Sequence, residues 1–352
     1  MDEKQNGWWL FNGIEELDSP ALLIYPDRVK KNIDTAIKMA ADPKKLRPHI
    51  KTNKSEDASR LMINAGIQKF KCATIAEAEM LGLVGAADVL LAYQPVGPKL
   101  KRLIGLIKKF PATTFSCLAD HPLAASQMSE TFAKEKISVP IYIDLNIGQN
   151  RTGITPGDSM IELYLTCSKL KGIQPVGLHA YDGHIRDMDW NLRKKNCDAA
   201  FSLIEKMREA IQSKGLPSPK IIAGGSPTFS IHCSRPDIEC SPGTFVYWDK
   251  GYLDLCPEQE FLPAALVLTR VISKPGSSSI CLDLGHKSVA AENEISRRVY
   301  FPGAPELKPT GQSEEHLVLQ TDGKRDWPIG ETLFGIPYHI CPTVALYERA
   351  YT

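Results

Sequence analysis

One lysine in the amino-terminal part of the chain is placed to act as a reactive amine. Lys51 lies within the run RPHIKTNK, which begins at Arg47 and ends at Lys54. The run changes from apolar to polar residues, which is typical of a strand that ends in a loop before a helix. A lysine at such a strand end can act as a nucleophile. A basic cluster is equally typical of a solvated surface loop, so other motifs must decide between the two interpretations.

Two further polar runs follow apolar segments of strand length. The first, 144–153, is a glycine-flanked loop that could place Arg151 over an anionic or aromatic ligand. Outside such a site, an arginine of this kind is more often a surface ion-pair partner. The second run brings four functional side chains together at a strand end, which favours a site over a structural histidine. These four are His179, Tyr181, Asp182 and His184.

Two glycine turns could bind a phosphate group. The first is Gly224-Gly225-Ser226-Pro227-Thr228, and the second is Ser241-Pro242-Gly243-Thr244. Glycine permits tight turns whose backbone N–H groups point at an anion. Each turn alone is an ordinary sequence, but phosphate sites in barrels commonly follow strands seven and eight, where both turns are expected.

A histidine and a cysteine near the carboxyl terminus have the spacing of metal ligands. His339 and Cys341 are two positions apart, so in an extended segment their side chains face the same side. Imidazole with thiolate suits Zn²⁺, and two protein ligands leave coordination positions for water or substrate. The alternative is a buried thiol beside a structural histidine.

The elements that must position these groups alternate between strand and helix, which predicts a parallel sheet. The predicted strands are 45–50, 69–74, 88–92, 113–118, 139–145, 173–180, 220–223 and 238–241. The predicted helices include 27–40, 55–65, 75–83, 122–136, 159–170 and 191–214. Eight such units close into a (β/α)8 barrel of the TIM type, whose functional groups lie where strands end and loops begin.

The last third of the chain predicts a separate β domain. Short β-like runs are expected at 264–273, 279–283, 316–320 and 332–336, with turn residues between them. The first residues contain apolar side chains that need a partner, so they are expected to join this domain. The predicted domains are therefore 26–243 for the barrel, and 1–25 with 244–352 for the β domain, which carries the metal ligands.

Composition limits the class of protein and of partner. The 352 residues carry a formal net charge of +1, which argues against nucleic acid and an anionic membrane and favours a small-molecule partner. The amino terminus lacks the long apolar core of a signal peptide or membrane span. Nine scattered cysteines are typical of reduced thiols, so a cytoplasmic protein is expected.

Taken together, the motifs resemble the D-threonine aldolase and D-serine dehydratase family. This family consists of pyridoxal-phosphate enzymes with an alanine racemase-like fold, a (β/α)8 barrel followed by a β domain. The matching runs, in chain order, are 18–21, 47–52, 77–79, 148–153, 181–184, 224–228, 242–247, 313–316 and 339–343. Their order and spacing make the match specific. The fold also implies a homodimer.

The resemblance implies a role for each candidate residue. Lys51 would form the Schiff base with pyridoxal phosphate and act as the base at the substrate Cα, while His184 would assist proton transfer near the metal. Arg151 would address the phenolate oxygen of the cofactor. His339 and Cys341 would bind a divalent metal, Zn²⁺ or Mn²⁺. The implied cofactor-binding residues are Lys51, His49, Arg151, Tyr181, Gly224, Gly225, Ser226, Gly243, Thr244 and Tyr247.

The implied reaction is the lysis of a D-β-hydroxy amino acid, with two possible outcomes. β-Elimination would convert D-serine to pyruvate and ammonia, whereas Cα–Cβ cleavage would convert D-threonine to glycine and acetaldehyde. Dehydratases of the family tend to carry H-x-C and aldolases H-x-D, so Cys341 favours dehydration. The chain departs from the family at Tyr338, where asparagine is common, and at Ser226, where threonine is frequent.

Two interpretations from other classes remain open. The chain could bind pyridoxal phosphate without turnover, as a protein of vitamin homeostasis, although the β domain and the H-x-C motif argue against storage alone. It could also be a metal-dependent hydrolase without pyridoxal phosphate, in which Lys51 has no role.

Overall fold

The computed structural model describes residues 7–352, so residues 1–6 of the predicted β domain lie outside the described part. The chain divides into two compact units. One comprises the described residues up to Asn32 together with Val246–Thr352, and the other comprises Ile33–Phe245. The predicted boundaries, 25/26 and 243/244, lie slightly nearer the amino terminus in both cases.

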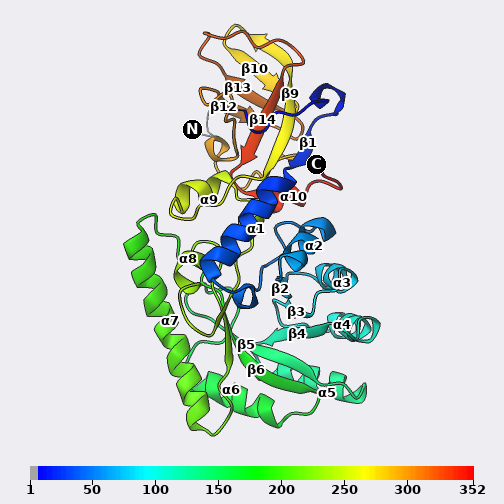
Figure 1. Cartoon of the computed structure of the whole chain (residues 1–352), viewed down its shortest axis with the longest axis vertical. Helices are drawn as coiled ribbons and strands as arrows, with labels where there is room; N and C mark the ends of the chain where they lie inside the picture. The colour runs from blue at the N-terminus through cyan, green and yellow to red at the C-terminus, as the bar shows by residue number, and fades with distance from the viewer. Residues whose placement is uncertain (1–6) are drawn as a thin grey trace. The chain divides into compact units, whose positions relative to one another are not determined.

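The unit Ile33–Phe245 is built on a seven-stranded parallel sheet with the order β2-β3-β4-β5-β6-β7-β8 (Figure 1). Every adjacent pair in this order is parallel, as expected for strands joined by crossover helices. The strands are β2 (Lys69–Cys72), β3 (Asp88–Leu91), β4 (Thr114–Ala119), β5 (Val139–Leu145), β6 (Ile173–Ala180), β7 (Lys220–Ala223) and β8 (Ile238–Cys240).

Helices follow most strands, and side-chain caps set where several of them begin. Thr74 accepts the backbone N–H of Glu77, and the Glu77 carboxylate accepts that of Ala73 at 2.6 Å, so α3 starts with a reciprocal cap. Asp189 caps α7 by accepting the backbone N–H of Leu192 at 2.7 Å. The helices are α1 (Pro26–Ala40), α2 (Glu56–Asn64), α3 (Ile75–Leu83), α4 (Pro98–Lys109), α5 (Pro122–Lys134), α6 (Asp158–Lys169), α7 (Trp190–Ser213) and α8 (Phe229–His232).

The predicted first barrel strand, 45–50, is not a regular strand, which corrects the eight-stranded prediction. Residues 46–50 instead make isolated bridges, Leu46 with Cys240 and His49 with Lys71. Backbone hydrogen bonds join the segment to β8 on one side and to β2 on the other, through Arg47 and Ile50 respectively. Pro48 has no N–H to donate, which interrupts a regular ladder. The observed sheet therefore has seven regular strands and an irregular connecting segment.

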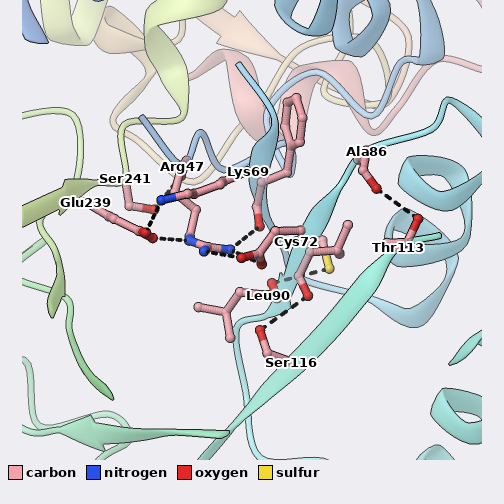
Figure 2. A network of polar contacts seen from close by, with 12 residues as sticks. Arg47, Lys69, Cys72, Ala86, Leu90, Thr113, Ser116, Glu239 and Ser241 are labelled. Atoms are coloured by element: carbon pink, nitrogen blue, oxygen red, sulfur yellow. Dashed lines mark hydrogen bonds and ion pairs between the residues drawn. The ribbon is translucent and has the colours of Figure 1, made fainter. Parts of the chain in front are cut away.

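Arg47 holds this segment through buried ion pairs. Its guanidinium is fully buried and contacts both oxygens of Asp88, at 2.7 and 2.9 Å, and Glu239 at 2.6 Å. Figure 2 shows Arg47 beside Glu239, which also forms an ion pair with Lys69. Asp88 begins β3 and Glu239 lies in β8. One side chain thus links the connecting segment to strands on both sides of it.

The other unit contains an antiparallel sheet with the order β11-β14-β9-β10-β13-β12, and β1 also pairs with β9. Apolar residues of the sheet form a core that includes Val267, Leu282, Leu319 and Trp327. The strands are β1 (Ala21–Ile24), β9 (Ala265–Gly276), β10 (Ser279–Leu282), β11 (Val299–Tyr300), β12 (Lys308–Gln312), β13 (Leu317–Gln320) and β14 (Thr332–Pro337). Two short helices accompany them, α9 (Lys250–Leu255) and α10 (Ile340–Val344).

Within residues 7–352, no helix has both the length and the apolar composition needed to cross a bilayer. The homodimer and the cytoplasmic location stay predictions.

Replacing Arg47 by methionine should destabilise the protein, because it leaves two acidic side chains without their buried partner. Removing one partner of a buried ion pair typically costs about 3–5 kcal/mol. Urea unfolding followed by circular dichroism would measure this loss as a lower midpoint.

Arg60→Met is the matched control, because Arg60 pairs with Glu56 on the exposed face of α2. Its unfolding midpoint should match that of the wild type. An Arg47→Met protein as stable as the control would show that the buried ion pairs do not hold the segment.

Candidate active site

Tyr181, directly after β6, lies at the centre of three positively charged side chains. The ring centroid is 6.0 Å from Lys51 Nζ, 5.7 Å from Lys71 Nζ and 5.1 Å from Arg151 Cζ. Within residues 7–352, none of the three cations forms an ion pair with a carboxylate. Like charges held this close repel one another, so the arrangement is suited to an anionic ligand.

Lys51 has an amine that is free to react. Its Nζ makes no hydrogen bond within the described residues, whereas the neighbouring Lys54 is held in an ion pair with Glu77. The backbone N–H of Lys51 donates to His49 Nδ1 at 3.3 Å. Burial, together with the charges of Lys71 and Lys51, lowers the pKa of His49 well below its usual value. The His49 ring is therefore neutral and can accept this bond.

Lys71, on β2, is a second lysine of the site that was not identified from the sequence. It is buried, and its Nζ is 3.4 Å from His179 Nε2. His179 Nδ1 lies 2.7 Å from Asp144 Oδ1, and the hydroxyl of Thr152 donates to Asp144 Oδ2 at 2.9 Å. Burial would raise the pKa of Asp144, but the bonds from His179 and Thr152 outweigh it and lower the pKa, so the carboxylate stays ionised.

Glycines allow the backbone to approach the Tyr181 ring. A Cβ at Gly225 would lie 2.9 Å from the ring, and one at Gly183 would lie 2.1 Å from the tyrosine oxygen. In the loop that carries Arg151, Gly148 has a φ of +124° and leaves no room for a Cβ beside the His184 imidazole. The two predicted runs therefore meet through Gly148 and His184.

The two predicted glycine turns also meet. The Ser226 hydroxyl accepts the backbone N–H of Gly243 at 3.3 Å and that of Thr244 at 3.1 Å. Gly224 has a φ of +81°, which only glycine adopts readily. All of these groups are buried. Two N–H donors and a hydroxyl thus converge where phosphate binding was predicted.

A buried acidic residue ties the loop after β6 to the turn after β7. Asp182 lies 2.8 Å from His232 Nε2 and accepts the Thr228 hydroxyl at 2.7 Å. Within residues 7–352, one group of three possible metal donors lies close together. It consists of Asp182, His232 and Cys197. Arg235 lies 2.6 Å from the other ring nitrogen of His232. Hydrogen bonds therefore account for this cluster without a metal ion.

The predicted metal ligands, His339 and Cys341, lie in the other unit, between β14 and α10. Their side chains are hydrogen-bonded to each other, so the imidazole and the thiol converge as predicted. Glu292, which the sequence interpretation missed, contacts His339 Nδ1. Burial disfavours the charged ring, but Cys341, Glu292 and Asp249 outweigh it and raise the pKa of His339 to about 9. The imidazole and the thiol together are suited to a cation such as Zn²⁺.

Two further predicted residues, His184 and Tyr247, differ in their exposure. His184 is exposed and lines a cavity of about 660 Å³ together with Ile147 and Asp187. Tyr247 is buried in the unit that contains the antiparallel sheet. Their assigned roles stay predictions.

The residues around Tyr181 fit pyridoxal phosphate. A free amine can bind its aldehyde, two further cations can face its anionic groups, and the Ser226 turn offers donors to its phosphate. The fit depends on the chemistry of these donors, and Gly225 and Gly243 let the backbone lie close to Tyr181 and His49.

Comparisons with known proteins found relatives that are similar to most of this chain. The D-threonine aldolase of Arthrobacter sp is 24% identical over 310 residues, covering 86% of this chain and 80% of that protein. The D-threo-3-hydroxyaspartate dehydratase of Delftia sp. (strain HT23) is 25% identical over 364 residues, covering 94% and 93%. The crystal structure of D-threonine aldolase from Filomicrobium marinum superposes with a TM-score of 0.88 at 24% identity, covering 95% and 90%.

Family comparisons match both parts of the chain. Residues 24–250 match "Alanine racemase, N-terminal domain", and residues 264–352 match "Putative serine dehydratase domain". The fold is thus alanine racemase-like, with a curled parallel sheet and a carboxyl-terminal antiparallel sheet. The chain belongs to the alanine racemase N-terminal domain family, and the resemblance to pyridoxal-phosphate lyases drawn from its sequence is confirmed.

Proposed function

We propose that the protein is a pyridoxal-phosphate- and metal-dependent lyase that dehydrates D-serine to pyruvate and ammonia. The observation that carries this proposal is the group of three cations around Tyr181, none of which has a carboxylate partner within the described residues. Like charges gathered this closely are suited to an anionic ligand. Pyridoxal phosphate is an anion whose aldehyde also needs the free amine that Lys51 offers.

Each part of the site then has a task. Lys51 would hold the cofactor through its amine and would remove the Cα proton of the substrate. Arg151 would bind the phenolate oxygen, and the turns at Ser226, Gly243 and Thr244 would hold the phosphate. The cofactor supplies an electron sink for the negative charge at Cα. The neutral His49 lies beside Lys51 and does not add a charge that would compete with it.

The metal site supports a reaction at the β-hydroxyl group of the substrate. His339 and Cys341 would hold the ion, and Glu292 would fix the imidazole through Nδ1, which leaves Nε2 for the metal. A divalent ion can act as a Lewis acid on the hydroxyl and make it a better leaving group. Neither simple cofactor storage nor metal hydrolysis without the cofactor would use both sets of residues.

Retro-aldol cleavage is the second candidate reaction, because two of the compared proteins are D-threonine aldolases. The dehydratase relative shows that elimination also occurs among proteins of similar sequence. Cys341 favours elimination, since the resemblance associates H-x-C with dehydratases. The proposed substrate is D-serine, whose hydroxyl leaves as water after Cα deprotonation.

Lys51→Ala should abolish covalent cofactor binding. Wild-type protein reconstituted with pyridoxal phosphate is expected to show a visible absorption band that borohydride removes, and the variant should show none. Activity should fall by at least about a hundredfold, because a general base is lost. Lys99→Ala, which removes an exposed lysine beside Tyr93, is the control and should keep the band. A wild-type protein without any band would contradict the proposal.

The products should distinguish the two reactions on one substrate. With D-threonine, elimination gives 2-oxobutyrate and ammonia, whereas cleavage gives glycine and acetaldehyde. We expect 2-oxobutyrate from D-threonine and pyruvate from D-serine, measured by chromatography and by coupled reduction of the 2-oxo acid. Glycine and acetaldehyde as the main products would identify an aldolase instead.

Cys341→Ala should remove both bound metal and activity. Atomic absorption is expected to find roughly one equivalent of metal in the wild type and little in the variant. Dialysis against a chelator should inactivate the wild type, and Zn²⁺ or Mn²⁺ should restore it. Cys281→Ala, at a buried cysteine of β10, is the control and should keep its metal. Full activity after chelation would overturn the metal assignment.

A further inference from the structure

Lys71 is a buried cation that the proposed reaction does not yet use. Only 2% of the residue is exposed, and its Nζ lies 5.7 Å from the ring centroid of Tyr181, directly after β6. The sequence places it outside every motif of the resemblance. A buried lysine that shares the Tyr181 ring with Lys51 and Arg151 adds repulsion to the folded protein, which a bound anion would offset.

The hydrogen bonds of Lys71 are incomplete. A lysine ammonium has three N–H donors, yet its one hydrogen bond within residues 7–352 goes to His179 Nε2, at a long 3.4 Å. His179 in turn contacts the Asp144 carboxylate, so the imidazole ring separates this carboxylate from Lys71. Buried charged groups normally have a direct partner. Two donors are therefore left for a ligand in the pocket.

The charge of Lys71 can change near neutral pH. Burial, followed by the nearby charge of Lys51, lowers the pKa of Lys71 to about 7, against the opposing effects of Asp144 and Asp182. The charged or titratable groups that act on it are Lys51, Arg47, His49, His179, Asp144 and Asp182. A bound anion would favour the ammonium form and raise this pKa. Binding of an anion and protonation of Lys71 should therefore support each other.

We propose that Lys71 is an additional ligand-binding residue of the site, which donates its two free N–H groups to an anionic oxygen of the bound ligand. This inference rests on the proposed function, because it assumes that pyridoxal phosphate and an amino acid occupy the pocket. The anionic oxygen belongs either to the cofactor or to the α-carboxylate of the substrate. Both would offer Lys71 the same chemistry, and binding measurements can separate them.

Cofactor binding is the first measurement. The dissociation constant of pyridoxal phosphate is determined by titration of its visible band for the wild type, Lys71→Met, Lys71→Arg and the control Lys99→Met. If the cofactor is the partner, Lys71→Met should bind it roughly ten- to a hundredfold more weakly. Lys71→Arg, which keeps the charge, should recover part of the affinity. Lys99→Met should behave as the wild type.

Substrate binding is the second measurement, made with the cofactor-loaded proteins. D-Alanine has an α-carboxylate but no β-hydroxyl to eliminate, and D-alaninamide lacks the carboxylate charge. If the substrate is the partner, Lys71→Met should lose the preference for D-alanine over the amide, while its cofactor affinity stays unchanged. The spectral change of the bound cofactor reports both ligands without turnover.

The pH dependence provides a check that does not depend on activity. The ratio of dissociation constants between Lys71→Met and the wild type should be largest below about pH 7, where Lys71 is charged, and should fall toward one as the pH rises beyond the pKa of the bound form. Ionisation of the cofactor itself cancels in this ratio. If Lys71→Met fails to fold, the same ratio taken with Lys71→Gln gives the profile.

The outcomes separate this inference from the proposed function. Wild-type protein that binds pyridoxal phosphate, with Lys71 variants equal to it for both ligands at every pH, would overturn the role of Lys71 alone. Wild-type protein that binds no pyridoxal phosphate would overturn the proposed function and this inference with it. A loss of affinity for either ligand that follows the expected pH profile supports the role.

Discussion

The position of Lys51, the proposed catalytic lysine, depends on the buried ion pairs of Arg47. Its guanidinium joins Asp88 at the start of β3 to Glu239 in β8, and so fixes an irregular segment that lacks a full set of ladder hydrogen bonds. Lys51 lies four residues further along the chain. A lysine in place of Arg47 could not reach both acidic groups at once, because only a planar guanidinium presents donors in several directions. The position of Lys51 thus depends on one buried side chain that precedes it in the same segment.

The side chains around Tyr181 concentrate positive charge at the proposed ligand site. Lys51, Lys71 and Arg151 repel one another, and the buried acids Asp144 and Asp182 offset part of that repulsion from outside the Tyr181 group. Both acids are held as carboxylates by hydrogen bonds from histidine and threonine. An anionic ligand bound beside these side chains would offset the rest of their repulsion.

Much of this arrangement could be predicted, because a parallel sheet brings the ends of all its strands to one edge. That rule was enough to group Lys51, Arg151 and Tyr181 and to expect the turns at Ser226 and Gly243 to meet. Lys71 could not be distinguished in the same way. It shares the sequence Lys-Phe-Lys with Lys69, on the same face of β2, and only the fold shows that Lys69 pairs with Glu239 while Lys71 does not. Glu292 was missed because it is far from His339 in the chain. The eighth strand was predicted wrongly because Pro48, which has no N–H to donate, interrupts the ladder there.

The pairing of β1 also determines the order in which the chain can fold during synthesis. β1 lies between β9 and Tyr351, because Ile24 N–H donates to the Tyr351 carbonyl at 2.8 Å and Tyr351 N–H donates to the Leu22 carbonyl at 2.9 Å. The unit Ile33–Phe245 can form as soon as its own residues have left the ribosome. β1, which is made before it, can pair with β9 only after that strand, Ala265–Gly276, has emerged, and with Tyr351 only after Tyr351 has been made. Until then, the unpaired edges of this apolar strand can bind wrong partners.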